Sequence, residues 1–250
     1  MVEQLKLHIL VIGGSGGIGL AVVKHLLSEL SRFDFLDIHV AATYHSQKPE
    51  IDDKRLNWYQ VDVTQESDIV ELRSQFDQLD WLINCVGMLH TPEFGPEFGP
   101  EKNLSSIDPE FFLKNISVNT LPSLLLAKHF TPVLKMSANP KFAVVSAKVG
   151  SISDNRLGGW YSYRSSKAAL NMFIKTMSIE WQRSIKKGTV IALHPGTTDT
   201  ALSKPFQGNV PQGKLFESSY VAHQLVDIIR TSTPDNSGHF YAYDGEQLSW

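Results

Sequence analysis

Short apolar runs alternate along the chain with longer segments in which hydrophobic residues recur every three or four positions. The first run, residues 7–12, ends in Gly13-Gly14, as suits a buried parallel strand. Strands are expected at residues 7–12, 38–44, 56–61, 81–86, 142–146, 189–194 and 239–243. Helices are expected at residues 18–30, 67–76, 109–136, 161–184 and 219–230.

This alternation implies right-handed βαβ crossovers and a parallel sheet. The sequence therefore predicts an α/β fold, a doubly wound Rossmann-type arrangement with a mainly parallel seven-stranded sheet and helices on both faces. No linker interrupts the pattern, so residues 1–250 are expected to form a single domain. Asp108-Pro109 predicts a helix start, with an N-cap acid before a proline at the first helical position. Glu-Phe-Gly-Pro occurs twice in a row at 93–100 and predicts a loop whose role stays open.

Composition narrows the class of protein. Hydrophobic residues make up 42% and charged residues 20% of the chain, an ordinary globular balance, and the formal net charge is −3. That charge favours neither nucleic acid nor an anionic membrane surface as a partner. Cys85 is the only cysteine, which fits a reducing compartment. The first residues lack the features of a signal peptide and no apolar stretch approaches about 20 residues, so a soluble cytoplasmic protein is expected.

A glycine-rich string lies where the first strand meets the first helix. A phosphate must approach backbone N–H groups closely there, and the helix offers unpaired donors and the positive end of its dipole. The string fits G-x-G-x-x-G through Gly14, Gly16 and Gly19, and it fits G-x-x-x-G-x-G through Gly13, Gly17 and Gly19. The alternative is a glycine turn without a ligand. The residues expected to bind a dinucleotide here are Gly13, Ser15, Gly17, Ile18 and Gly19.

The end of the second strand bears on which dinucleotide binds. An acidic residue there would hold the ribose hydroxyls of NAD(H), but this strand continues into Thr43, His45 and Ser46 with Lys48 nearby. Thr43 and His45 are therefore expected to contact the cofactor, and NADP(H) is favoured while NAD(H) remains possible. The alternative is that these are ordinary solvated loop residues.

Tyr163 and Lys167 are four residues apart at the start of a predicted helix, so they share one face. A cation beside a phenol stabilises the phenolate and lowers the phenol pKa, as a general acid for carbonyl reduction requires. Such a pair is common by chance, and its alternative is a surface polar pair. Tyr161 competes for the role but has no lysine four residues later.

The ordered set of motifs resembles the short-chain dehydrogenase/reductase family over nearly the whole chain. Besides the glycine string and the Tyr163–Lys167 pair, the matching segments are Asp62-Val63, Asn84-Cys85-Val86-Gly87, Asn119 and Pro195-Gly196 with Thr198 and Thr200. The resemblance implies that Asn119 is catalytic. It implies cofactor contacts for Asp62, Val63, Asn84, Val86, Gly87, Pro195, Gly196, Thr198 and Thr200. As alternatives, Asp62 caps a helix and Asn119 breaks one.

Within this family the chain is most similar to C-factor-like and sniffer-like carbonyl reductases, on residues 150–164 and the tail 243–246. One departure concerns the catalytic serine, which the family places second in a Ser-Ser pair. Here the pair is Ser146-Ala147. Ser146 is the first candidate, Ser151 the second, and the third possibility is that no serine acts.

The resemblance implies NADP(H)-dependent reduction of a small aldehyde or ketone. Tyr163 would donate the proton, Lys167 would lower the Tyr163 pKa and hold the ribose, Ser146 would orient the carbonyl, and Asn119 would hold a water. The family implies a homodimer or a homotetramer. No catalytic metal is expected. A cofactor-binding signalling protein with little turnover is the main alternative, and a nucleotide-sugar epimerase is a weaker one.

The expected substrate pocket is apolar. Its walls are expected to include Met88, Leu89, Trp160, Leu202 and Phe206, although Trp160 and Phe206 could instead pack a lid formed by residues 197–216. His194 is expected to be structural rather than a base.

Overall fold

The protein, described as a computed structural model over residues 5–28, 36–94 and 99–250, is built on one large sheet with the strand order β10-β9-β6-β5-β4-β1-β2-β3. The expected parallel strands are confirmed. They are β1 (Leu5–Ile12), β2 (Leu36–Tyr44), β3 (Leu56–Gln60), β4 (Trp81–Asn84), β5 (Lys141–Val145), β6 (Thr189–His194) and β9 (His239–Ala242). An eighth strand, β10 (Gln247–Leu248), pairs antiparallel with β9 and was not predicted, because two residues carry no readable alternation.

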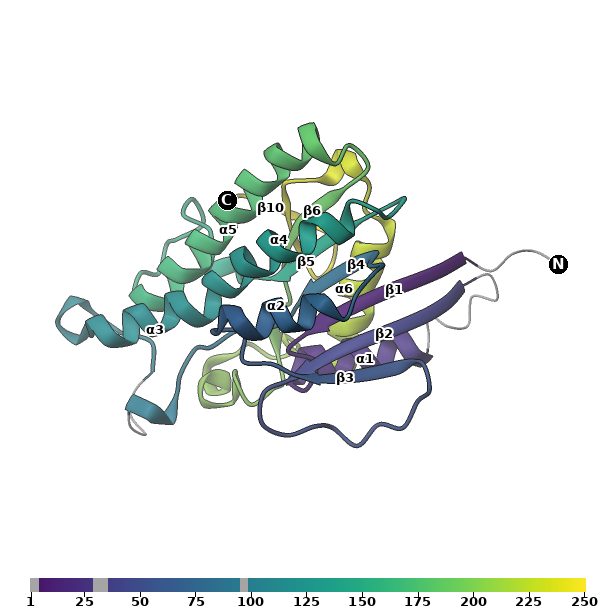
Figure 1. Cartoon of the computed structure of the whole chain (residues 1–250). Helices are drawn as coiled ribbons and strands as arrows, with labels where there is room; N and C mark the ends of the chain where they lie inside the picture. Colours follow the sequence, from purple (N-terminus) through teal and green to yellow (C-terminus); the bar gives the residue numbers. More distant parts are fainter. Residues whose placement is uncertain (1–4, 29–35, 95–98) are drawn as a thin grey trace.

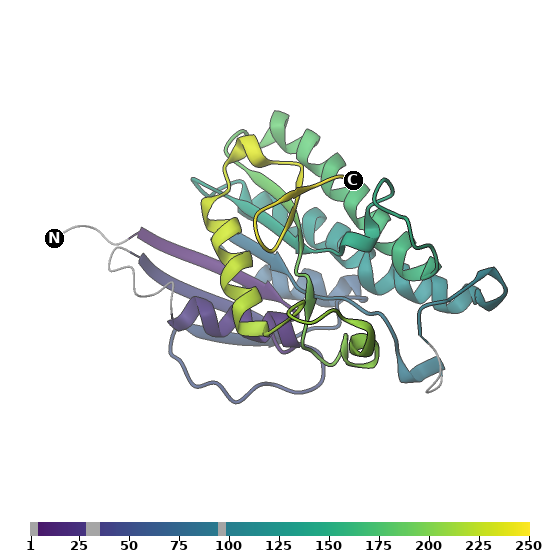
Figure 2. The same ribbon diagram turned by 180° about the vertical axis from the view of Figure 1, so that it is seen from behind.

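Helices cover both faces of the sheet, as Figures 1 and 2 show from opposite sides. They are α1 (Gly17–Ser28), α2 (Glu66–Ser74), α3 (Pro109–Asn119), α4 (Leu121–Leu134), α5 (Tyr161–Ser184) and α6 (Ser218–Thr231). One buried core packs α2, α4 and α5 on one face, through residues such as Ile69, Phe130 and Ile174. The other core packs α1 and α6 through Val22 and Leu225. The doubly wound prediction is confirmed.

The expected continuous helix at 109–136 is divided, and this prediction was wrong. Thr120 has φ −116° and ψ −59° between α3 and α4. Pro122, in the first turn of α4, has no N–H to continue the hydrogen-bond ladder of α3, and its ring crowds the carbonyl four residues earlier. The expected cap is confirmed, since Asp108 Oδ1 accepts a hydrogen bond of 2.8 Å from Phe111 N.

Lys141 is buried at the start of β5, at the end of the sheet away from the glycine string. Its ammonium donates to the carbonyl oxygens of Ile229, Arg230 and Ser232, where α6 ends. Burial lowers the pKa of Lys141 to about 8. A cation at this position complements the negative end of the helix dipole.

Two connections near the carboxyl ends of the strands have local structure of their own. In residues 197–216, β7 (Thr197–Thr198) pairs with β8 (Leu215–Phe216) around a 3-10 turn at Lys204–Asn209. In the duplicated Glu-Phe-Gly-Pro loop, Pro92–Phe94 form a 3-10 turn, and residues 95–98 lie outside the described part. The expected end of the first helix at Leu30 also lies outside it. Within the described residues, no helix is both long and apolar enough to span a membrane.

The order of the strands places a crevice at a defined point. The chain runs outward from β1 through β2 and β3 on one side, and through β4 and β5 on the other. In open α/β sheets, ligands bind beyond the carboxyl ends of the strands at such a switch point. A ligand site is therefore expected beyond the carboxyl ends of β1, β4 and β5.

Candidate active site

A cavity of about 430 Å³ opens at this switch point. The predicted site residues that line it are Gly17, Ile18, Val86, Gly87, Ser146, Tyr163, Lys167, Pro195, Gly196, Thr198 and Thr200. The predicted site residues outside its lining are Gly13, Ser15, Gly19, Thr43, His45, Asp62, Val63, Asn84 and Asn119. The structure thus brings the Tyr–Lys pair, part of the glycine string and the loop after β6 to one hollow.

The glycine string is packed so closely that side chains are excluded at several of its positions. Gly13 has φ +73°, and its N–H donates to Thr43 Oγ1 at 2.9 Å. A Cβ on Gly17 would lie 2.5 Å from Thr200 Cγ2, and one on Gly19 would overlap the carbonyl oxygen of Gly13. Gly16 and Gly17 face the cavity. This bare backbone at the start of α1 fits the pyrophosphate of a dinucleotide.

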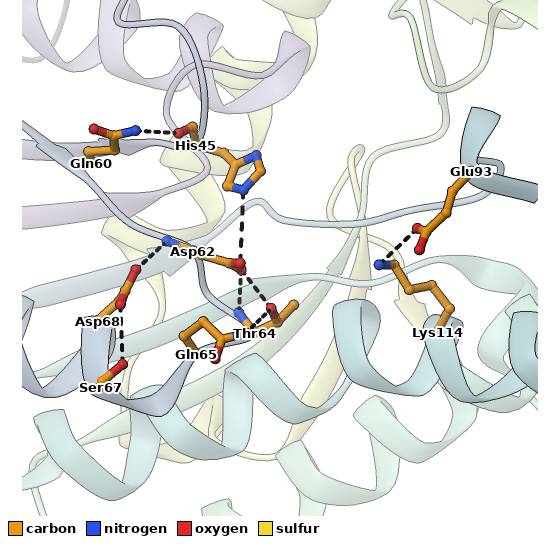
Figure 3. Close-up of polar contacts among 9 residues, drawn as sticks. All are labelled: His45, Gln60, Asp62, Thr64, Gln65, Ser67, Asp68, Glu93 and Lys114. Carbon is orange, nitrogen blue, oxygen red and sulfur yellow. Dashed lines mark hydrogen bonds and ion pairs between the residues drawn. The ribbon is translucent and has the colours of Figure 1, made fainter.

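The residues at the end of β2 differ from the expectation. Thr43 is buried, and its hydroxyl accepts from Gly13, so it supports the glycine string from behind rather than facing an open ribose site. His45 is exposed, with 76% of its side chain accessible, and Nε2 lies 3.9 Å from Asp62 Oδ2. Figure 3 shows this imidazole directed toward the Asp62 carboxylate.

Asp62 shapes its own loop. Its Oδ1 accepts from Thr64 N at 2.9 Å and from Thr64 Oγ1 at 2.7 Å, as Figure 3 shows. Burial raises the pKa of Asp62, but the hydrogen bonds from Thr64 outweigh this effect and the pKa lies below its ordinary value. Asp62 does not cap α2, whose N-cap is Gln65. Val63 is buried in the core between the sheet and α2.

Two asparagines brace the chain that follows β4. Asn84 Oδ1 accepts from Val86 N at 3.0 Å, while Nδ2 donates to Ser123 Oγ. Asn119 Oδ1 accepts from Met88 N at 2.7 Å, and Nδ2 donates to Met88 O and Ser166 Oγ. Both amides are therefore engaged with protein groups, and they fix the wall that presents Val86 to the cavity. Asn119 Oδ1 accepts one of these bonds and has a second lone pair with which it can accept from a water.

Tyr163 and Lys167 lie one turn apart on α5, which begins and ends where the sequence predicted. Lys167 Nζ lies 5.9 Å from the centre of the Tyr163 ring and donates to Val145 O at 3.1 Å. Burial raises the pKa of the Tyr163 phenol, and burial lowers the pKa of Lys167 to about 8. Desolvation is the cause of both shifts, and the lowering of the Tyr163 pKa by Lys167 stays a prediction.

The serine candidates are separated by the structure. Ser146 lines the cavity, and its hydroxyl donates to Asn171 Oδ1 at 2.6 Å. Ala147 lines the cavity beside it. Ser151 lies in a different hollow with Ser153 and Asp154 and accepts from Asp154 N. Of the two candidates, only Ser146 shares the cavity of Tyr163.

A tight turn immediately precedes α5. Gly158, Gly159 and Trp160 all have left-handed backbones, and Trp160 (φ 55°) is the only non-glycine residue with positive φ in the described part of the chain. Glu101 holds this turn in place. Its main-chain oxygen accepts from Trp160 N at 2.5 Å, and its carboxylate, 4% exposed, accepts from the N–H and the hydroxyl of Ser162. Nothing in the sequence indicated a role for Glu101, because its partners lie about 60 residues later.

The other end of the cavity is apolar and aromatic. Leu89, Trp160, Leu202 and Phe206 line it as expected. Met88 does not, because it is buried and its main chain is clamped by Asn119, and that prediction was wrong. The Phe206 ring lies 5.4 Å from that of Trp160 and 5.9 Å from that of His90, between ring centres.

His194 and Cys85 also line the cavity, and burial shifts the pKa of both. His194 Nδ1 accepts from Lys148 N at 3.2 Å, and burial lowers the pKa of His194 to about 4, so the ring is neutral near pH 7. This bond agrees with a structural role. Burial raises the pKa of the Cys85 thiol to about 12, which makes it a poor nucleophile. Among the described residues, no group of three or more His, Cys, Asp or Glu is placed to hold a metal.

Comparisons with known proteins agree with this geometry. A family model described as short chain dehydrogenase matches residues 7–210. A 1-hydroxy-2-glutathionyl-2-methyl-3-butene dehydrogenase of Rhodococcus sp. (strain AD45) is 32% identical over 201 residues, which cover 76% of this chain and 78% of the relative. C-signal of Myxococcus xanthus is 30% identical over 148 residues, which cover 59% of this chain and 83% of the relative. The crystal structure of an NADPH-bound carbonyl reductase from chicken fatty liver has the same fold, with a TM-score of 0.81 at 23% identity, covering 100% of this chain and 96% of that one.

Proposed function

This chain belongs to the short-chain dehydrogenase family, and we propose that it reduces a small aldehyde or ketone to the alcohol with NADPH. The observation that carries the proposal is the placement of Tyr163 and Lys167 in the wall of a cavity that also contains the bare glycine backbone. A phenol and an ammonium at one end, with a pyrophosphate cradle at the other, are the parts that carbonyl reduction requires.

The proton comes from Tyr163. The buried phenol is protonated near neutral pH and can donate as the carbonyl oxygen gains negative charge, but burial raises its pKa and so opposes the transfer unless a cation stabilises the phenolate. The Lys167 ammonium faces the ring, and it stabilises the phenolate once the proton has left. Ser146 provides a hydroxyl on the same wall that can orient the carbonyl oxygen, in the manner of an oxyanion hole.

The dinucleotide would be held by backbone at Gly16 and Gly17 and by the loop containing Pro195, Thr198 and Thr200. When bound, the reduced nicotinamide supplies the hydride. The proposed preference for NADPH rests on the lack of an acid at residues 43–46 and on exposed His45 and Lys48, which can meet a 2′-phosphate. Asp62, 3.9 Å from His45, limits that preference, because its carboxylate repels a phosphate unless His45 lies between them.

The test is a panel of aldehydes, ketones and quinones assayed with NADPH and with NADH, using wild type and Tyr163→Phe. We expect a higher kcat/KM with NADPH than with NADH. Tyr163→Phe should lower kcat by about 10²–10⁴-fold, the usual contribution of a general acid, while NADPH binding followed by fluorescence is retained. Tyr161→Phe, outside the cavity lining, is the matched control and should keep its turnover. Normal turnover by Tyr163→Phe would refute the role of the phenol.

A second candidate is a cofactor-binding regulatory protein with little turnover. It is favoured by Ala147 beside Ser146 and by the Ser146 hydroxyl, which donates its proton to Asn171. The similarity to C-signal is a further reason to keep it. NADPH binding without oxidation by any member of the panel would favour this candidate.

We also propose that the chain forms a homodimer or homotetramer through α4 and α5 and acts in the cytoplasm. Phe130 on α4 and Leu170 on α5 are buried in the core and do not contribute to such a contact. Leu121 and Leu124 on α4, and Met172 on α5, are exposed instead. Light scattering that gives a monomer mass would contradict this proposal.

A further inference from the structure

Three polar side chains occupy one face of α5 at four-residue intervals: Tyr163, Lys167 and Asn171. The first two line the cavity, and Asn171, 3% exposed, lies behind it. The face is joined to the end of β5 by two adjacent hydrogen bonds. Lys167 Nζ donates to Val145 O, and Ser146 Oγ donates to Asn171 Oδ1. Asn171 is thus the third member of a row whose other members belong to the proposed reaction.

The bond between Ser146 and Asn171 decides where the hydroxyl proton of Ser146 points. A serine hydroxyl has one proton to give and two lone pairs with which to accept. In the structure that proton is given to Asn171 Oδ1 at 2.6 Å, so in this arrangement it is not available to a carbonyl in the cavity. Ser146 can orient a substrate only if this hydrogen bond is reversed or released.

The amide of Asn171 has an unused donor that can make this reversal. Its Nδ2 is buried and has no hydrogen-bond partner. The oxygen and nitrogen of a side-chain amide have nearly the same shape, so a half turn of the amide exchanges them in place. After this turn an N–H of Asn171 donates to Ser146 Oγ.

We propose that Asn171 is a positioning residue that turns its amide when a carbonyl enters the cavity, donates to Ser146 Oγ and so directs the Ser146 proton onto the carbonyl oxygen. This inference rests on the proposed function. The donated hydrogen bond also polarises the hydroxyl, which strengthens the bond that the hydroxyl makes in turn. Asn171 acts only through Ser146, since it does not line the cavity.

The test is a double-mutant cycle between Asn171→Leu and Ser146→Ala, with a carbonyl that the wild type reduces. Leucine is close to asparagine in size but neither donates nor accepts. We expect Asn171→Leu to lower kcat about tenfold, the effect of one hydrogen bond in the transition state, with the NADPH dissociation constant within about twofold of wild type. In the Ser146→Ala background the same substitution should change kcat less than about twofold, because the residue through which it acts is gone.

The control is Ser178→Ala, a buried polar residue further along α5 whose hydroxyl bonds to Lys175 O, and its kcat should equal that of wild type. Thermal unfolding checks that each variant folds, and Asn171→Ala replaces Asn171→Leu if leucine is not accommodated. A kcat at or above wild type in the Asn171 variant would overturn the proposal, since the amide would then be withholding the proton. Equal losses in both backgrounds would also overturn it. A wild type that reduces no carbonyl would instead refute the proposed function from which the inference starts.

Discussion

The two ends of the cavity are built in different ways. The end proposed to hold the nucleotide is made largely of backbone from one continuous stretch, Gly13 to Gly19, where a Cβ would overlap its neighbours at Gly13, Gly14, Gly17 and Gly19. The carbonyl end is made of side chains from separate segments, with Glu101 and Phe206 meeting the turn at Trp160. A site made of local backbone constraints is readable as a motif. A site made of distant side chains is not, because only the fold brings them together.

Gly19→Ala is expected to have the largest effect, because it tests whether close packing of backbone builds the glycine end of the cavity. The new Cβ would overlap Gly13 O and lie 2.9 Å from Gly13 C and 3.2 Å from Gly14 Cα, atoms that cannot move without disturbing the string. We expect a loss of about 3 kcal/mol in the free energy of unfolding, at the upper end of overpacking costs, and loss of NADPH binding. Gly16→Ala is the control, because its Cβ would find only Gly13 O at 3.5 Å. Similar unfolding temperatures for the two variants would show that close packing is not what the glycines provide.

Glu101→Gln tests the carbonyl end. Glutamine keeps one acceptor oxygen for the Ser162 N–H, and its NH2 can donate to the Ser162 oxygen, but the Ser162 hydroxyl proton then loses its acceptor and both charge-assisted bonds become neutral ones. The expected loss is about 2 kcal/mol in the free energy of unfolding, measured by denaturant titration, and kcat should fall because Tyr163 follows on the same turn. Glu110→Gln, an exposed acid in the first turn of α3, should change stability by less than about 0.5 kcal/mol. An equally small loss of stability for Glu101→Gln would show that Glu101 does not hold the turn before α5.

Phe206→Leu should have the smallest effect of the three substitutions, and it tests the aromatic wall of the cavity alone. The ring contacts Trp160 and His90 rather than the residues of the proton transfer. Losing it should cost about 1 kcal/mol for an aryl ketone, seen as a several-fold rise in KM, with kcat and NADPH affinity unchanged. A short aliphatic aldehyde should show no change in KM. An equal rise for both substrates would mean that Phe206 shapes the lid rather than the wall.

The sequence predicted the elements with strong periodicity and missed those decided by tertiary contacts. Helix α5 was predicted to the residue, since its apolar face recurs over many turns. The break at Thr120 was missed because the apolar pattern runs across it, although Pro122 was the available signal. The short strand β10 depends on pairing with β9 rather than on a pattern of its own.

The predicted site residues show the same difference between local patterns, which the sequence reveals, and tertiary contacts, which it does not. Tyr163 and Lys167 meet because four-residue spacing on a helix fixes their relation. Thr43, predicted to contact the cofactor, and Met88, predicted to line the pocket, are both buried, because the direction of a side chain at the end of a strand depends on the neighbouring chain that covers it. Asn171 lacked any signal, since its importance comes from the end of β5 packing against it.

The ammonium of Lys141, enclosed by the carbonyl oxygens that end α6, gives the fold an unusual response to alkali. Its pKa is about 8 in the folded protein and about 10.5 in the unfolded chain, so between these values the unfolded chain binds more protons. Within that window this group makes the folded state gain stability as the pH rises, opposite to the loss that a surface lysine paired with an acid would cause. A series of melting curves from pH 7 to about pH 10, compared with Lys141→Met, would isolate this contribution.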